Sequence, residues 1–142
     1  YTSLASLRDK KILRVVRQKA SKTGIKVNST SFKKRIKRKA VWGLEQLVCL
    51  LRLGRKKKID PANLKGSWAG AFGMPQFIPT SFEKYGIDWE KNGIVNLDRL
   101  PDSVASVAHY LRAHGWKKSI NHANALRVIK HYNHSQPYAN TI

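Results

Sequence analysis

The stretch KGSWAGAFGMPQFIPTSF, residues 65–82, is apolar enough to be buried, yet it contains three glycines, two prolines and one amide side chain, Gln76. Glycine lets a backbone pass close to another object, and an amide offers both hydrogen-bond donors and an acceptor. Such a surface suits a sugar. A tight crossing of a helix and a loop, in which the glycines serve packing alone, explains the same residues equally well.

Helix signals lie on both sides of this stretch. PTS at residues 79–81 predicts the start of a short helix that Gly86 ends, and LPDSVASVAHYLRAHG at residues 100–115 predicts a longer helix with a proline in its first turn. A further helix is expected over residues 123–131, before an irregular tail. Apolar residues recur at helical spacing in the longer helix and in two upstream segments: Val104, Val107, Ala108 and Leu111; Val41, Leu44, Leu47, Val48 and Leu51; and Leu4, Leu7, Ile12, Val15 and Val16.

The segment between the two upstream patterns, SKTGIKVNSTSFKKRIKRK at residues 21–39, is cationic and has little periodicity, which predicts a loop leading into a basic helix start. Runs of alternating β-branched residues are missing, so we expect a mostly α fold. A length of 142 residues fits one compact domain, and we expect a single domain over residues 1–142 with a basic N-terminal portion at about 1–58.

The charge is strongly basic and unevenly placed. The chain carries 28 Lys and Arg against 8 Asp and Glu, a formal net charge of +20, and residues 1–60 hold 19 of the basic and three of the acidic side chains. Such a surface attracts polyanions, so nucleic acid, anionic lipid and acidic wall polymers all qualify as partners. The run KKRIKRK suits phosphates, but no base-reading or stacking motif accompanies it, and nucleic acid is therefore disfavoured.

Cysteine and histidine usage argues against several kinds of site. Cys49 is the single cysteine and lies in the apolar run LEQLVCLL, so we expect a buried thiol and no intrachain disulfide. No cluster of Cys and His ligands, phosphate-binding glycine loop or redox motif is present, and the five His residues are expected to be surface or packing residues. No run approaches the ~18 apolar residues of a membrane span, and the first residue is not Met, so we interpret the sequence as a mature domain or fragment without its targeting segment.

Four separated blocks carry a family resemblance. GSWAGAFGMPQFIPTSF (66–82), YGIDW (85–89), SVASVAHYLRAHGW (103–116) and HYNHSQPY (131–138) resemble, in matching order and spacing, the catalytic domain of lytic transglycosylases of the membrane-bound and soluble B type. The resemblance covers the chain from about residue 59 to the C terminus. It implies a lysozyme-superfamily helical fold that acts on the glycan strands of peptidoglycan, in the periplasm, at the cell envelope or after secretion.

The resemblance also implies which side chains line the saccharide groove. Hydrogen-bonding groups among aromatic faces suit a pyranose, because the sugar has hydroxyls at its rim and C–H groups on its faces. The matching positions are Ser67, Gln76, Phe77, Tyr110, Tyr132 and Asn133, with Tyr138 as a looser match.

A calcium loop similar to an EF-hand is a further implication of the resemblance, at DWEKNGIVNLDRLPD, residues 88–102. Gly93 stands at the sharp turn, but Arg99 takes the position of the usual bidentate glutamate. A metal-free, hydrogen-bonded turn is therefore slightly favoured over a structural calcium site, and no cofactor is required. The candidate oxygen donors are the side chains of Asp88, Glu90, Asn92 and Asp102 and the carbonyl group of Ile94.

Glycosidic cleavage needs a proton donor, usually a carboxylic acid with a raised pKa. Of the three glutamates, Glu83 lies outside the matched groove residues and Glu90 lies in the candidate ion loop. Glu45 remains, and VWGLEQ at residues 41–46 resembles the family signature around its catalytic glutamate. The helical neighbours of Glu45, one turn away in each direction, are apolar, and an apolar surrounding raises the pKa of a carboxyl group.

A rival alignment puts a different residue in the acid position. Glu45 precedes Ser67 by only 22 positions, which is shorter than is usual in this family. Placing VVRQKAS, residues 15–21, on the family pattern Arg-x-Glu-Ser restores a longer separation and puts Lys19 where the acid belongs. A lysine with a pKa near ~10.4 protonates a glycosidic oxygen poorly, so the chain would be inactive. Both alignments stay open, and Glu45 is favoured.

The sequence thus predicts an enzyme, a peptidoglycan lytic transglycosylase that cleaves the β-1,4 bond between N-acetylmuramic acid and N-acetylglucosamine. Glu45 would act as the single general acid and base and leave a 1,6-anhydro product, since no second carboxylate is obvious near the groove. The alternatives are a lysozyme-like hydrolase and a catalytically inactive peptidoglycan-binding module. We expect glycan strands as the partner, anionic wall polymers as a candidate second partner, and a monomeric chain.

Overall fold

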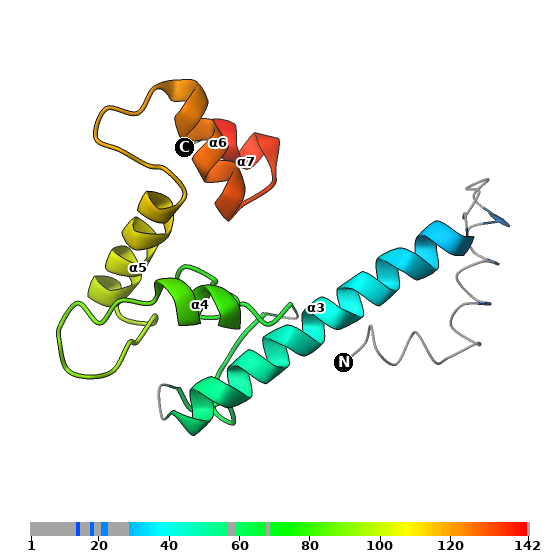
Figure 1. The fold of residues 1–142 in the computed structure, drawn as a ribbon, viewed down its shortest axis with the longest axis horizontal. Coiled ribbons are helices and arrows are strands. Elements are labelled where there is room, and N and C mark those ends of the chain that lie inside the picture. The colour runs from blue at the N-terminus through cyan, green and yellow to red at the C-terminus, as the bar shows by residue number, and fades with distance from the viewer. Residues whose placement is uncertain are drawn as a thin grey trace. The chain divides into compact units, whose positions relative to one another are not determined.

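The computed structural model describes residues 14, 18, 21–22, 29–56, 59–67 and 69–141, most of them helical (Figure 1). Within this part of the chain no β-strand forms, and two isolated β-bridges are the only extended pairing. The prediction of a mostly α fold is therefore confirmed. The helices that the structure describes with bounds are α3 (Ser29–Arg55), α4 (Pro79–Tyr85), α5 (Leu100–Ala113), α6 (His122–Tyr132) and α7 (Gln136–Thr141).

The chain divides into two compact units, residues 1–51 and 52–142, and each is described by itself. The apolar pattern expected to form a helix around residues 4–16 lies almost entirely outside the described residues, as does Lys19. The single domain over residues 1–142 stays a prediction. Among the helices in the described ranges, none is both long and apolar enough to cross a membrane.

Helix α3 begins earlier than the sequence predicted. Residues 21–39 were expected to form a loop that leads into a basic helix start, and α3 already begins at Ser29. The many cations hide an apolar series with a spacing of four, in which Phe32 and Ile36 are half-buried and Ala40 is buried. Lysine and arginine also have good helix propensity, so the basic composition does not oppose the helix.

The apolar stripe predicted within residues 41–51 lies mostly on the exposed side of α3. Val41 and Val48, for example, are 51% and 54% exposed, whereas Cys49 is buried, as expected for its thiol. None of the residues of the predicted stripe is among the buried residues of this helix. The buried residues of this helix are Ala40, Gln46, Cys49 and Leu53.

The second unit contains α4 to α7, and its short helix and longer helix begin and end close to the predicted positions. Pro79 opens α4, and the Gly86 N–H that caps it donates to the carbonyl oxygen of Phe82. Helix α4 packs on α5, α5 on α6, and α6 on α7, and Figure 1 shows the last two side by side. The tail was expected to be irregular but contains α7. The carbonyl oxygen of Ser135, the residue before this helix, accepts the N–H of Ala139.

Helix α5 buries a serine-bearing face more deeply than the predicted apolar stripe, of which Val107 and Leu111 are half-buried. Val104 of the apolar stripe is 58% exposed, while Ser103, Ser106 and Tyr110 are buried. The reason is hydrogen bonding: the Ser106 hydroxyl accepts the N–H of Ile87 at 2.9 Å, and the Ser103 hydroxyl donates to the carbonyl of Leu97 at 2.5 Å. Small hydroxyl groups are needed on this face because it satisfies the backbone of an adjacent loop.

Two irregular segments flank α4. We call residues 66–77 the glycine loop, of which residue 68 lies outside the described residues, and residues 87–99 the carboxylate loop. The glycine loop holds Gly70, Gly73 and Gln76 at positive φ, and the carboxylate loop holds Lys91 and Gly93 in the same region. Each loop therefore carries backbone conformations that helices and strands do not use.

Candidate functional site

The glycine loop is a small set of backbone pairs with Ser67 at one end and Gln76 at the other. The Ser67 N–H donates to Ala71 at 2.7 Å, and Phe72 and Phe77 exchange both of their backbone hydrogen bonds. The Ser67 hydroxyl accepts the Ala71 N–H at 3.2 Å. The Gln76 amide nitrogen donates to the Gly73 carbonyl at 2.9 Å, so this exposed amide is oriented by its own loop.

Gly73 fixes the glycine loop against the carboxylate loop. Its φ is +68°, and a Cβ atom at this position would lie 2.3 Å from the Cβ of Leu97. The next residue, Met74, donates its N–H to the Leu97 carbonyl at 2.9 Å. Glycine is therefore required at residue 73 because two loops approach each other closely there. The sequence had left open a sugar-binding surface or a crossing of a helix and a loop.

Three of the predicted site residues form the centre of an aromatic cluster. The ring centroid of Phe77 lies 5.7 Å from that of Tyr110 and 6.2 Å from that of Tyr132, and the two tyrosine rings are 5.5 Å apart. The Tyr132 hydroxyl donates to the carbonyl of Pro75, which joins the end of α6 to the glycine loop. Residues 57 positions apart in sequence are thereby brought together.

Three other members of this cluster were not predicted from the sequence. His114 stacks on Tyr110 with a centroid distance of 4.1 Å, Tyr85 approaches Tyr110 at 4.8 Å, and His131 lies 5.0 Å from His114. The spacing of four between Tyr110 and His114 is a helical contact and was the available signal. We call these residues, Phe77, Tyr85, Tyr110, His114, His131 and Tyr132, the aromatic cluster.

The residues of the candidate site differ in burial. Phe77 and Tyr110 are buried, and the Tyr110 hydroxyl is used internally as a donor to the His131 carbonyl at 2.8 Å. Burial raises the pKa of both Tyr110 and Tyr132, with smaller contributions from neighbouring tyrosines, so both phenols are neutral donors at neutral pH. A direct contact between these rings and a sugar stays a prediction.

Asn133 and Tyr138 lie next to the cluster in sequence. Asn133 ends α6, and its side-chain oxygen accepts the N–H of Ser135 at 3.0 Å, which shapes the turn into α7. Tyr138 is on α7 and is 36% exposed. With Ser67 and Gln76 also exposed, the exposed polar groups of the candidate site come from the glycine loop and from the segment after α6.

Glu45, the predicted acid, lies at an exposed position of α3, in the first unit. Its neighbours Val41 and Trp42 are exposed as well, whereas Cys49, one turn further on, is buried. Its part in catalysis stays a prediction, as does the rival assignment to Lys19.

In the carboxylate loop, carboxylate oxygens accept backbone N–H groups. Asp88 accepts the N–H groups of Asn92 at 3.1 Å and Gly93 at 2.7 Å. Asp102, fully buried at the start of α5, accepts those of Trp89 at 2.9 Å and Asn96 at 2.8 Å. The hydrogen bond from Asn96 is the main cause that lowers the pKa of Asp102.

Glu90 has a cation as its partner. The Arg99 guanidinium donates to its carboxylate at 2.8 Å, and the two side chains are 55% and 28% exposed. Asn92 uses its side-chain oxygen to accept the N–H of Ile94 at 2.9 Å. In the described residues no group of three or more His, Cys, Asp or Glu side chains is arranged to hold a metal ion.

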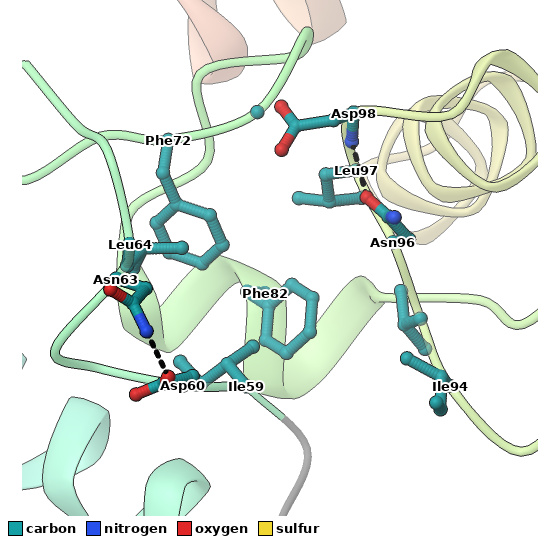
Figure 2. A pocket seen from close by; sticks show the side chains of 12 residues that line it. Ile59, Asp60, Asn63, Leu64, Phe72, Phe82, Ile94, Asn96, Leu97 and Asp98 are labelled. Atoms are coloured by element: carbon teal, nitrogen blue, oxygen red, sulfur yellow. Dashed lines mark hydrogen bonds between the residues drawn. The ribbon is translucent and has the colours of Figure 1, made fainter.

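A cavity of about 240 Å³ lies between the two loops and the start of the second unit (Figure 2). Figure 2 shows the rings of Phe72 and Phe82 and the side chain of Leu97 pointing toward it, with Asp60 and Asp98 at its edge. None of the predicted substrate-binding residues lines it. Its volume is below the ~300–1,000 Å³ of most small-molecule sites, so we interpret it as a packing feature.

Comparisons with known proteins agree with the resemblance. Residues 8–127 match the family model of the transglycosylase SLT domain. Over 81 residues, 57% of this chain, the sequence is 43% identical to membrane-bound lytic murein transglycosylase B of Escherichia coli strain K12, of which the match covers 22%.

Solved structures give the same result. The E. coli lytic transglycosylase SLT35, solved in complex with bulgecin A and in complex with calcium, is 42% identical over 59% of this chain and 27% of its own, with a TM-score of 0.56. The soluble lytic transglycosylase SltB1 of Pseudomonas aeruginosa is 25% identical over 68% of this chain and 52% of its own, with a TM-score of 0.62. The chain spans about a quarter of the length of the first of these relatives. Because residues 8–127 match the family model, the chain belongs to the transglycosylase SLT domain family, with a lysozyme-like helical fold.

Proposed function

We propose that this chain cleaves the glycan strands of peptidoglycan as a lytic transglycosylase. The single observation that supports this most is the joining of the glycine loop to the end of α6 by the Tyr132–Pro75 hydrogen bond over the aromatic cluster. This contact brings the loop that carries exposed Ser67 and Gln76 to the end of the helix that half-buried Asn133 follows, beside the buried rings of Phe77 and Tyr110. Such a combination suits recognition of an acetamido sugar.

Glu45 supplies the proton in the proposed reaction. Its carboxyl group protonates the glycosidic oxygen between N-acetylmuramic acid and N-acetylglucosamine, and that bond breaks. The C6 hydroxyl of the muramyl residue attacks its own C1 atom, and the carboxylate of Glu45 takes the hydroxyl proton. The product is a 1,6-anhydro sugar, no water is consumed, and no cofactor takes part.

The acidic side chains of the second unit support a single-acid route over hydrolysis by two carboxylates. Most of them already hold the fold together: Glu83 pairs with Arg52 at 2.8 Å, and Asp60 accepts the N–H of Ala62 at 3.0 Å. Those with a structural contact of this kind are Asp60, Glu83, Asp88, Glu90 and Asp102.

Digestion of purified sacculi, followed by mass spectrometry of the released muropeptides, tests the proposal. We expect 1,6-anhydro muropeptides from the native chain and a loss of at least ~100-fold in Glu45→Gln, because general acid catalysis contributes 10²–10⁴-fold. Glu83→Gln is the matched control and should retain activity, since Glu83 lies in a surface ion pair.

Three other outcomes identify the alternatives. Reducing muramic ends would indicate a hydrolase. Binding of sacculi without any release, with activity gained by Lys19→Glu, would indicate an inactive binding module whose acid position is residue 19. Full activity of Glu45→Gln would remove Glu45 from the mechanism. The envelope location and the affinity for anionic wall polymers belong to the same proposal, and the net charge of +20 supports the second.

A further inference from the structure

A second cavity lies between the end of α5, the connection to α6 and the first turns of α6. Figure 1 shows this connection as a long loop. The cavity has a volume of about 300 Å³, at the lower end of the ~300–1,000 Å³ of most small-molecule sites. Buried Val128 and half-buried Ile120 supply the apolar part of its lining. The polar and basic lining residues are His114, Lys117, Ser119, Asn121, Asn124 and Arg127.

The lining of this cavity has positive charge without a carboxylate to balance it. Lys117 and Arg127 are exposed, and no aspartate or glutamate occurs between residue 103 and the C terminus. The ion pairs formed within the described ranges involve neither of these two side chains. A cavity that offers two cations and no acidic group attracts an anionic ligand.

His114 belongs both to this cavity and to the aromatic cluster. It lines the cavity, and its ring stacks on Tyr110 with a centroid distance of 4.1 Å. Its Nδ1 atom lies 2.7 Å from the carbonyl oxygen of Tyr110. Because a carbonyl can only accept, Nδ1 carries the hydrogen atom of this contact, which orients the ring. The cavity therefore borders the rings that the proposed function places beside the sugar.

We propose that this cavity binds a carboxylate group of a peptidoglycan stem peptide, with Lys117 and Arg127 as the cationic partners. The choice of ligand rests on the proposed function, since the stem peptide is attached to the muramyl sugar and carries free carboxylates. A guanidinium group can donate two parallel hydrogen bonds to a carboxylate. Ser119 and Asn124 add a hydroxyl and an amide, and both groups can donate to carboxylate oxygens.

Binding of a short peptide tests the inference without requiring cleavage. The probe is N-acetyl-L-alanyl-γ-D-glutamyl-L-lysine, which has two carboxylates, and its comparison is the same peptide amidated at both. Titration of the full chain at low ionic strength, followed by NMR of the backbone N–H groups of residues 114–128, gives the Kd of each peptide. The acid should bind at least ~10-fold more tightly than the diamide, because only the acid has a group for the two cations.

Two double variants separate the cavity from the overall charge. Lys117→Gln with Arg127→Gln should raise the Kd of the acid by about 10-fold, since each exposed charge contact contributes a few-fold. Lys118→Gln with Lys130→Gln is the matched control. It removes the same net charge from exposed side chains that do not line the cavity, and it should raise the Kd by less than ~2-fold. Because all four side chains are exposed, both variants should fold, which circular dichroism checks.

Three results would overturn the inference. Equal losses in the two double variants would mean that net charge alone explains binding. Equal affinity for the acid and the diamide would mean that the carboxylates are not recognised. Binding of glycerol phosphate in the cavity without binding of the tripeptide would assign the site to a wall phosphate. Muropeptide release from sacculi together with any of these would remove this inference alone, whereas tripeptide binding without muropeptide release would contradict only the proposed cleavage.

Discussion

The glycine loop and the carboxylate loop lie on either side of α4, and both hold irregular backbone, but they satisfy their N–H groups in different ways. In the glycine loop, main-chain carbonyls accept the N–H groups of Ser67, Phe72 and Gln76. In the carboxylate loop, the acceptors are mostly side-chain oxygens, those of Asp88 and Asp102 above all. The stability of the glycine loop should therefore depend on the size of its residues, and that of the carboxylate loop on single oxygen acceptors.

The largest effect should come from one added carbon in the glycine loop. Gly73→Ala places a Cβ atom 2.3 Å from the Cβ of Leu97 and forces a non-glycine residue to φ +68°. Backbone strain of ~1–2 kcal/mol and overpacking of ~1–3 kcal/mol predict that the free energy of unfolding falls by about 3 kcal/mol. Urea unfolding followed by circular dichroism measures it.

Gly70→Ala is the control for this prediction. Gly70 has φ +82°, but no atom lies within 4 Å of the position of an added Cβ, so only the strain of about 1 kcal/mol should appear. Equal losses in the two variants would mean that close approach to Leu97 does not matter, and the loop would not be limited by shape.

The second largest loss of stability should come from replacing one carboxylate oxygen by nitrogen. Asp102→Asn keeps the size of the side chain but places an amide NH₂ group against a backbone N–H. One of the N–H groups of Trp89 and Asn96 then loses its acceptor. We expect a loss of about 2–3 kcal/mol in the free energy of unfolding. Asp98→Asn changes an exposed carboxylate of the same loop and should stay within about 0.5 kcal/mol of the native chain. Similar values for both variants would contradict the role assigned to the Asp102 oxygens.

The smallest loss of stability should come from removing the Tyr132 hydroxyl, which joins α6 to the glycine loop. Tyr132→Phe keeps the ring in the aromatic cluster and removes the donor to the Pro75 carbonyl, at a cost of about 1 kcal/mol. Tyr138→Phe, on exposed α7, is the control and should be neutral in stability. If the hydroxyl positions Gln76 and Asn133 for substrate, Tyr132→Phe should also slow release of muropeptides from sacculi, while circular dichroism shows a folded chain.

The same tyrosine gives a pH dependence. Burial raises the pKa of Tyr132, so the folded chain holds its phenolic proton above the pKa of ~10 that the unfolded chain has. The contribution to stability is therefore complete below about pH 10 and is lost as the pH rises through the folded-state pKa. The melting temperature of the native chain should fall more steeply above pH 10 than that of Tyr132→Phe, and identical slopes would contradict the assignment.

Helices α4, α5 and α6 could be predicted because their signals are local. Pro79 at the first turn of α4, Gly86 after its end and the periodic segment of α5 need no knowledge of the rest of the fold. The start of α3 and the existence of α7 were missed because a cationic segment and a short polar one carry weak local signals.

Three members of the aromatic cluster were predicted from the sequence, whereas the other three and the geometry of the cluster were not. The motif order placed Gln76, Phe77, Tyr110 and Tyr132 in one site, and the structure brings the last three into one aromatic cluster. The sequence did not show that Tyr110 directs its hydroxyl to the His131 carbonyl, or that His114 stacks on its ring, because these contacts depend on how α5 and α6 meet.

What the sequence determined by itself is therefore the helical class, the family and part of the aromatic cluster, because each of these follows from residue types in a fixed order and spacing along the chain. Only the tertiary structure decided which faces are buried and which groups are partners. The buried face of α5 carries serines because Ile87 and Leu97 need hydrogen-bond partners, and Arg99 faces Glu90 because the loop folds back between them. Burial and pairing are set by groups that meet only when the chain folds, so periodicity along one helix cannot reveal them.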